Sequence, residues 1–168
     1  RIRSQIYPGA WRILLTGQKP VEDLSSRREM LVTQQESVYR SSIQDDGKTA
    51  IFRFTNVSDG TGETSVVKID ASSLAPDPMT SAACTSVGIQ KIYYSTIGMG
   101  VKIFFDASTD VLAWQLNADW SDTLDFTDFT SIPNNSGSGK TGDILFSTVG
   151  ASNNDVYNII IQVSKSYA

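Results

Sequence analysis

The segment Asn134–Thr141, with the sequence NNSGSGKT, is the part of the chain that comes closest to a catalytic motif. A phosphate-binding loop needs a glycine, four further residues and then Gly-Lys-Ser/Thr, so that backbone N–H groups surround the phosphates. The last three residues fit, but Asn134 stands where the first glycine belongs. The motif also needs a helix after it, whereas strand-forming residues follow here. The sequence therefore predicts a polar loop that binds no nucleotide.

Six aspartates form the densest group of candidate metal ligands. They fall between Ile103 and Gly139, with no Lys or Arg among them: Asp106, Asp110, Asp119, Asp122, Asp125 and Asp128. Clustered carboxylate oxygens suit Ca²⁺, so a structural calcium site is one interpretation, although the spacing does not match an EF-hand. Two of these acids can also be imagined as the pair that glycoside hydrolysis needs, but nothing marks such a pair. We expect solvated turns and strand faces, and no cofactor or metal.

The chain has no histidine and a single cysteine, Cys84. Without histidine, neither Ser-His-Asp nor Cys-His catalysis is possible, and the commonest zinc ligand is missing. One cysteine cannot form an internal disulfide, and its small, uncharged neighbours predict a buried or half-buried and unreactive thiol. These observations indicate a protein that is not an enzyme and that has no small-molecule substrate.

Aromatic side chains are the remaining candidates for chemistry, because a row of exposed rings can stack on sugars. Those that the pattern singles out are Trp11, Trp114, Trp120, Tyr93, Tyr94, Phe104 and Phe105. Aromatic residues on strands usually belong to the core, and we expect that here. A carbohydrate-binding β-sandwich module is nevertheless kept as an alternative function.

Charge and the length of the apolar runs argue against two classes of partner, nucleic acids and membranes. Residues 1–50 hold 8 Lys or Arg and 6 Asp or Glu, whereas residues 51–168 hold 6 and 12. An acidic body repels phosphate, so we expect no nucleic-acid partner. No apolar run approaches the roughly 20 residues that span a bilayer, so we expect no membrane partner.

The elements that must position any site are strands. From Lys48 onward apolar and polar residues alternate, which predicts strands at 50–57, 64–69, 87–95, 101–105, 111–116, 123–126, 143–149 and 156–163. Turn residues recur between these runs, and we expect hairpins to join the first two and the last two strands. The sequence therefore predicts an all-β fold, a jelly-roll-like β-sandwich of about eight strands with little helix.

Residues 1–42 lack a sustained period, apart from a weak helical pattern over Pro20–Met30, and are predicted to be an extended N-terminal arm ahead of a sandwich domain at 43–168. Such a segment alone in water cannot offset its ordering entropy, which indicates an assembly contact. The residues predicted to bind a partner are Ile2, Arg3, Ile6, Trp11, Arg12, Ile13 and Leu15. Trp11 is the predicted hot spot among them, because aromatic anchors dominate interfaces.

From Val66 to Ile161 the order of strands and turns resembles small virion structural proteins of tailed bacteriophages of the marine and cyanobacterial type. The segments that carry the resemblance are Val66–Leu74, Cys84–Tyr93, Phe104–Ala107, Ile132–Asn135, Thr141–Ile144 and Asp155–Ile161. The resemblance rests on the rhythm of strands and turns and supplies no active site. It implies a structural protein of the virion, assembled in the host cytoplasm.

Within that resemblance we expect a capsid decoration or cement protein on the capsid exterior. Its expected partners are the major capsid protein and copies of itself, because an apolar, mildly basic segment precedes an acidic body. A tail, neck or baseplate component of the same particle is the nearest alternative.

Overall fold

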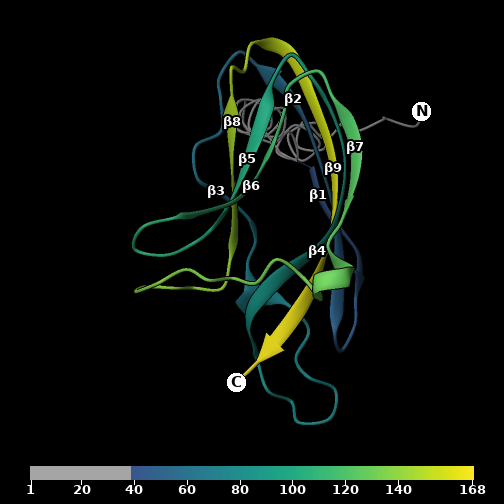
Figure 1. Cartoon of the computed structure of the whole chain (residues 1–168), viewed down its shortest axis with the longest axis vertical. Helices are drawn as coiled ribbons and strands as arrows, with labels where there is room; N and C mark the ends of the chain where they lie inside the picture. The colour runs from purple at the N-terminus through teal and green to yellow at the C-terminus, as the bar shows by residue number, and fades with distance from the viewer. Residues whose placement is uncertain (1–38) are drawn as a thin grey trace, which may run out of the picture. The chain divides into compact units, whose positions relative to one another are not determined.

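The computed structural model describes residues 39–168, which form an all-β sandwich (Figure 1). This part of the chain contains nine strands in two antiparallel sheets and two single-turn 3-10 helices, Ala71–Ser73 and Thr127–Phe129, but no α-helix. Within it, no helix has the length and apolar character needed to cross a membrane. The prediction of an all-β sandwich is confirmed.

The order of strands in the two sheets gives the topology. Sheet A has the order β1 (Tyr39–Asp45), β2 (Thr49–Asp59), β9 (Asn153–Tyr167), β4 (Cys84–Ile97) and β7 (Ser121–Asp125). Sheet B has the order β3 (Val66–Ile69), β8 (Ile144–Val149), β5 (Gly100–Phe105) and β6 (Val111–Leu116). The chain changes sheet at every connection except β1–β2 and β5–β6. This is the arrangement of an eight-stranded jelly roll, with β1 added at one edge.

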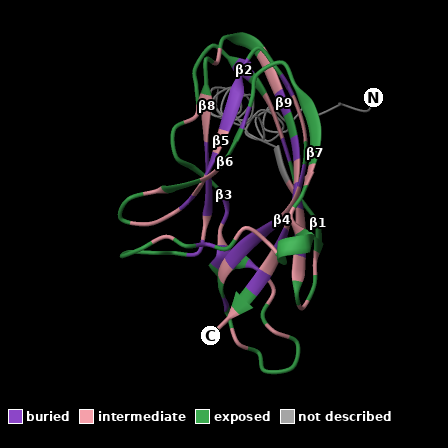
Figure 2. Cartoon of the chain, viewed as in Figure 1, coloured by how far each residue is buried: buried purple, intermediate pink, exposed green. Residues whose placement is uncertain are grey.

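The core lies between the sheets and is made by alternate residues of the central strands (Figure 2). Phe52 and Phe54 on β2 point inward beside Ile159 and Ile161 on β9. Phe146 of sheet B meets Phe54 edge to face, with ring centroids 5.2 Å apart. Alternation is what a strand with one buried face requires, so the period-two pattern of the sequence did identify these strands.

The two predicted hairpins, which were expected to join the first two strands and the last two strands, are both wrong. β3 does not pair with β2 but with β8 in the opposite sheet, and β8 does not pair with β9 but with β3 and β5. Turn residues are present between these strands, such as Gly150 with φ +71°. A turn reverses the chain, but it does not decide whether the next strand stays in the same sheet.

The predicted boundary at residue 42 falls inside β1. Ser41 and Ser42 pair with Arg53 and Phe52 of β2, so residues 39–42 belong to sheet A. The rest of the predicted arm lies outside the described residues. So do the weak helical pattern over 20–30 and the predicted partner-binding residues Ile2, Arg3, Ile6, Trp11, Arg12, Ile13 and Leu15.

Candidate binding surfaces

The NNSGSGKT loop does not have the surroundings of a phosphate-binding loop. The side-chain oxygen of Asn134 accepts hydrogen bonds from the backbone N–H and the hydroxyl of Ser136, at 3.1 and 2.6 Å. Lys140 Nζ donates to the Asn134 carbonyl at 2.8 Å, so its ammonium group is held by its own loop. Strand β8, not a helix, follows. The lack of nucleotide binding stays a prediction.

The six aspartates do not form a cluster. Asp119 accepts a hydrogen bond from the Gly98 N–H at 2.7 Å, at one end of the sandwich. Asp125 forms an ion pair with Lys91 at 2.7 Å, and hydrogen bonds from Lys91 and from Thr127 lower the pKa of Asp125 to about 2. Over residues 39–168, no three Cys, Asp or Glu side chains are grouped so that they can hold a metal ion. Turn and edge contacts account for the aspartates.

One of two buried lysines in the described residues, Lys68, lies in a network that the sequence pattern did not single out. Lys68 Nζ lies 2.8 Å from Glu63 Oε1, and only 2% of the lysine side chain is exposed. The Glu63 carboxylate also accepts hydrogen bonds from Tyr157 and Asn56. Burial lowers the pKa of Lys68 and raises the pKa of the Tyr157 hydroxyl. Every member of this network has a partner within it, so we assign it to stability.

Cys84 is buried, as predicted. Its Sγ donates to the Ser86 carbonyl at 3.4 Å, and desolvation raises the pKa of the thiol. A raised pKa disfavours the thiolate, which is the nucleophilic form. This cysteine is therefore a small core residue.

The prediction that the singled-out aromatic residues lie in the core is mostly wrong. Among those within the described part, Phe105 is buried, Tyr94 and Phe104 are half-buried, and Tyr93, Trp114 and Trp120 are exposed to 42%, 38% and 58%. Trp114 lies on the edge strand β6 and has one side open to solvent, while its ring meets Phe126 edge to face at 5.1 Å. The core is instead built on Phe52, Phe54, Phe146 and Tyr157.

The outer face of sheet A holds a shallow open groove of about 570 Å³. Its lining includes Arg53, Tyr93, Ser95, Thr123, Asn158 and Ile160. Strand register explains why they meet: Arg53 pairs with Ile160, Ile160 with Tyr93, and Tyr93 with Thr123, across four neighbouring strands. At about 4.8 Å between strands, this row is about 14 Å long. Because the residues are far apart in the chain, only their outward position in each strand was visible in the sequence.

The polar groups of the groove are available to a ligand. Within the described part of the chain, the Arg53 guanidinium, the Tyr93 hydroxyl and the Asn158 amide make no hydrogen bond or ion pair. The neighbouring Ser95 and Ser121 hydroxyls bond to each other at 3.0 Å. A half-exposed tyrosine ring beside free donors and acceptors can both stack on and hydrogen-bond to a polar ligand. The groove is thus a candidate binding site.

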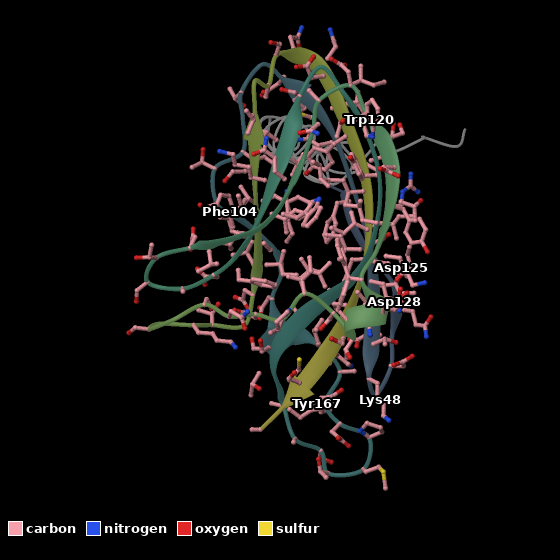
Figure 3. All side chains as sticks on the ribbon, viewed as in Figure 1. Lys48, Phe104, Trp120, Asp125, Asp128 and Tyr167 are labelled. Atoms are coloured by element: carbon pink, nitrogen blue, oxygen red, sulfur yellow. The ribbon has the colours of Figure 1, made fainter. Side chains whose placement is uncertain are left out.

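A second candidate surface is the apolar end of the sandwich, which we define as Val57, Val156, Ile97 and Trp120. Val156 pairs with both Val57 and Ile97, so these three side chains form one row on the outer face of sheet A. Val57 and Ile97 are each 61% exposed. Figure 3 shows Trp120 at the opposite end of the sandwich from Lys48 and Tyr167. The Trp120 carbonyl accepts the N–H of Thr96, the neighbour of Ile97 in the chain, so Trp120 lies at the same end as the row. Exposed apolar side chains at one end of a domain are candidates for an interaction surface.

Hydrogen bonds to backbone groups hold the apolar end in place. The Thr96 hydroxyl, which is buried, donates to the Asn117 carbonyl at 2.6 Å, and the Thr96 N–H donates to the Trp120 carbonyl at 2.9 Å. The Asp119 carboxylate accepts the Gly98 N–H, which fixes the β4–β5 turn against the β6–β7 loop. Trp120 and its neighbours are therefore presented on a rigid frame, which reduces the entropic cost of binding.

Comparison with known proteins gives only distant structural likenesses. No family model and no curated protein matches the chain. Solved structures of family 29 carbohydrate-binding modules are similar to it. One variant, in complex with mannohexaose, is 12% identical over 75% of this chain and 80% of that one, with a TM-score of 0.38. Two other family 29 variants give TM-scores of 0.36 and 0.37, again at 12% identity, over 75% and 77% of this chain and 81% and 86% of theirs.

Proposed function

We propose that this protein is a non-enzymatic structural component of a tailed-phage virion, a decoration or cement protein that binds the major capsid protein on the capsid exterior. The observation that carries the proposal is the apolar end, where Ile97 and Trp120 are exposed on a hydrogen-bonded frame. A rigid apolar surface gains stability when a partner covers it. Jelly rolls occur in viral capsid proteins, but a fold alone does not fix a function.

The N-terminal segment belongs to the same proposal. Its apolar residues, Ile2 and Trp11 among them, would pack on the capsid protein, while Arg3 and Arg12 would pair with acidic groups there. Because β1 begins at Tyr39, a deletion that tests the segment must stop at residue 38. The segment and the apolar end are proposed to contact the particle at the same time. Binding through one then raises the effective concentration of the other, which increases the overall affinity.

The test is co-sedimentation of purified protein with phage particles that lack it. We expect Ile97→Asp, and separately deletion of residues 1–38, to reduce particle association by at least about tenfold, because each removes apolar burial. Ile43→Asp is the matched control, since Ile43 is a similarly exposed isoleucine on β1. Association of the Ile43→Asp variant with the particles should be unchanged. Folding of each variant is checked by circular dichroism.

Two results would contradict the proposal. One is full association of both Ile97→Asp and the deletion variant. The other is a copy number per particle, measured by quantitative mass spectrometry, that is far below the copy number of the major capsid protein. A low copy number would favour the tail, neck or baseplate instead.

A second candidate function, glycan binding, is favoured by the groove on sheet A. Its exposed Tyr93, together with Arg53 and Asn158, whose side chains have no partner among residues 39–168, has the chemistry that holds a hydroxylated ring. If the groove binds glycans, Tyr93→Ala should abolish binding on a glycan array, because the stacking surface is lost.

Trp114→Ala supplies the control for this prediction, because Trp114 is an exposed aromatic on the other sheet, outside the groove. Equal loss of binding in both variants would place the contact elsewhere. No binding by the wild-type protein to any glycan would exclude this function and leave the virion proposal standing.

A further inference from the structure

A polar cavity of about 520 Å³ lies beside the start of β4 and the end of β9. Ser86 of β4 pairs with Ser166 of β9, and both residues line the cavity. Further lining residues come from the segment 131–140, which is held against β4 by the two backbone hydrogen bonds between Ile89 and Ile132. Three stretches that are far apart in the sequence therefore meet around one cavity on a fixed frame.

Gly88 makes room for hydroxyl groups on the β4 side of this cavity. A Cβ added to Gly88 would come 2.5 Å from Ser131 Oγ and 3.1 Å from Ser164 Oγ, so a larger residue would displace the Ser131 hydroxyl. The hydroxyls of Ser131 and Ser86 make no hydrogen bond within residues 39–168, although both residues are half-buried. Two hydroxyl groups that line the cavity are therefore open to a ligand.

The side chain of Asn134, which also lines the cavity, carries an unpaired buried donor. Its Oδ1 accepts hydrogen bonds from the N–H and the hydroxyl of Ser136, so the orientation of the amide group is fixed. Its Nδ2 is the one buried side-chain nitrogen or oxygen among residues 39–168 that has no partner, and only 9% of Asn134 is exposed. Because buried donors in native proteins are normally paired, an added acceptor is favourable here.

Charge indicates which kind of acceptor fits the cavity. Lys140 is its one charged lining residue, and no Asp or Glu lines it, although residues 51–168 hold 12 acidic and 6 basic residues. Lys140 Nζ donates one hydrogen bond to the Asn134 carbonyl, and an ammonium group has three N–H donors. The open groups of the cavity can thus all donate, next to a positive charge, which favours an anion over a neutral or cationic ligand.

We propose that this cavity binds an oxyanion, the anionic group of a phosphate, a sulfate or a carboxylate. The hydroxyls of Ser86 and Ser131 and the Lys140 ammonium group donate to the anion, and the Asn134 amide gains the acceptor that it lacks. The site is not a phosphate-binding loop, because side chains of separate segments and not successive backbone N–H groups supply the donors. It holds an ion and implies neither a nucleotide nor a substrate, and it does not depend on the proposed virion role.

The experiment is an NMR titration of the isotope-labelled full chain with sodium phosphate, sulfate and acetate in turn, at an ionic strength kept constant with chloride. We expect saturable shifts of the Asn134 side-chain amide and of the backbone amides of 85–88 with at least one anion, and the three titrations identify which. Lys140→Gln should weaken binding by at least about tenfold, because a charge-assisted hydrogen bond is lost. Lys102→Gln is the matched control, since it removes the same charge from a lysine on β5 that has no ion pair within residues 39–168. It should leave the affinity unchanged.

Two further variants test the cavity without removing the lysine. Ser131→Ala takes away one open hydroxyl and breaks no hydrogen bond of the described chain, and it should weaken binding several-fold. Asn134→Asp keeps an oxygen for Ser136 but replaces the Nδ2 donor with a charged oxygen, so it should abolish binding by repulsion. Circular dichroism checks that each variant is folded.

Three outcomes overturn the proposal. If no anion gives a saturable shift in the wild-type protein, water alone satisfies Asn134. If Lys140→Gln and Lys102→Gln weaken binding equally, the effect is one of overall charge. If Ser131→Ala and Asn134→Asp bind as the wild type does, the anion lies elsewhere.

Discussion

Replacing the buried lysine that pairs with Glu63, Lys68→Met, is expected to lower the free energy of unfolding by about 3 kcal/mol or more. The substitution keeps much of the side-chain volume, so the loss comes from charge. In the native protein the ammonium group lies 2.8 Å from Glu63 and faces the rings of Phe146 and Tyr157 at 5.6 and 5.9 Å. Without it, the Glu63 carboxylate is held among these rings without a cation, although Tyr157 and Asn56 still donate to it. The measurement is urea unfolding followed by fluorescence.

An exposed ion pair of nearly the same length supplies the control. Lys91 lies 2.7 Å from Asp125, but the side chains are 27% and 45% exposed. Water screens such a pair and solvates the partner that remains, so Lys91→Met should unfold close to the wild-type midpoint. Similar losses for Lys68→Met and Lys91→Met would mean that burial does not decide the effect. The double variant Lys68→Met with Glu63→Gln should recover part of the loss, because no unpaired charge is left.

Gly142→Ala is expected to be nearly as damaging, with a loss of about 3 kcal/mol. Gly142 lies just before β8 with φ +95°, where any side chain is strained. An added Cβ would also come 2.2 Å from the Thr85 carbonyl oxygen and 2.9 Å from the Ser86 Cα. Both obstacles are backbone atoms of β4, so the chain entering β8 would have to move away from β4. Urea unfolding again measures the loss.

Gly150→Ala separates the cost of the left-handed backbone conformation from the cost of a steric clash. Gly150 also has positive φ, at +71°, but nothing lies within 4 Å of its ideal Cβ position. The substitution should therefore cost only the left-handed backbone penalty, about 1 kcal/mol. If Gly142→Ala proves as mild as Gly150→Ala, then the β4–β8 approach is softer than the structure indicates.

The sequence located the strands well because one buried face forces a period of two. Phe52 and Phe54 alternate with Ile51 and Arg53, and the structure places the first pair in the core and the second pair outside. Pairing was harder to predict, because turn residues such as Gly150 favour a reversal in either sheet. A jelly roll alternates between sheets, so neighbours in the chain are mostly not neighbours in a sheet.

The sites were less predictable for two physical reasons. Lys68 sits in the strand VVKI, where a charged residue among apolar ones indicates a solvent-facing position. It shares the inner face with Val66, which pairs with the core residue Phe146. The groove combines Arg53, Tyr93 and Asn158, which only strand register brings together. No local pattern reports register between strands this far apart in the chain.

Strand β9 has a consequence for how the protein is made. It is the last of the strands in residues 39–168, yet it is central in sheet A, where Ile161 pairs with Phe52 on one side and with Ile92 on the other. Until it emerges from the ribosome, the apolar strands β2 and β4 have no partner between them. Contacts over such long stretches of chain close slowly, and exposed apolar strands attract chaperones or aggregate. The main sheet therefore cannot form until β9, the last strand of the domain, has been synthesised.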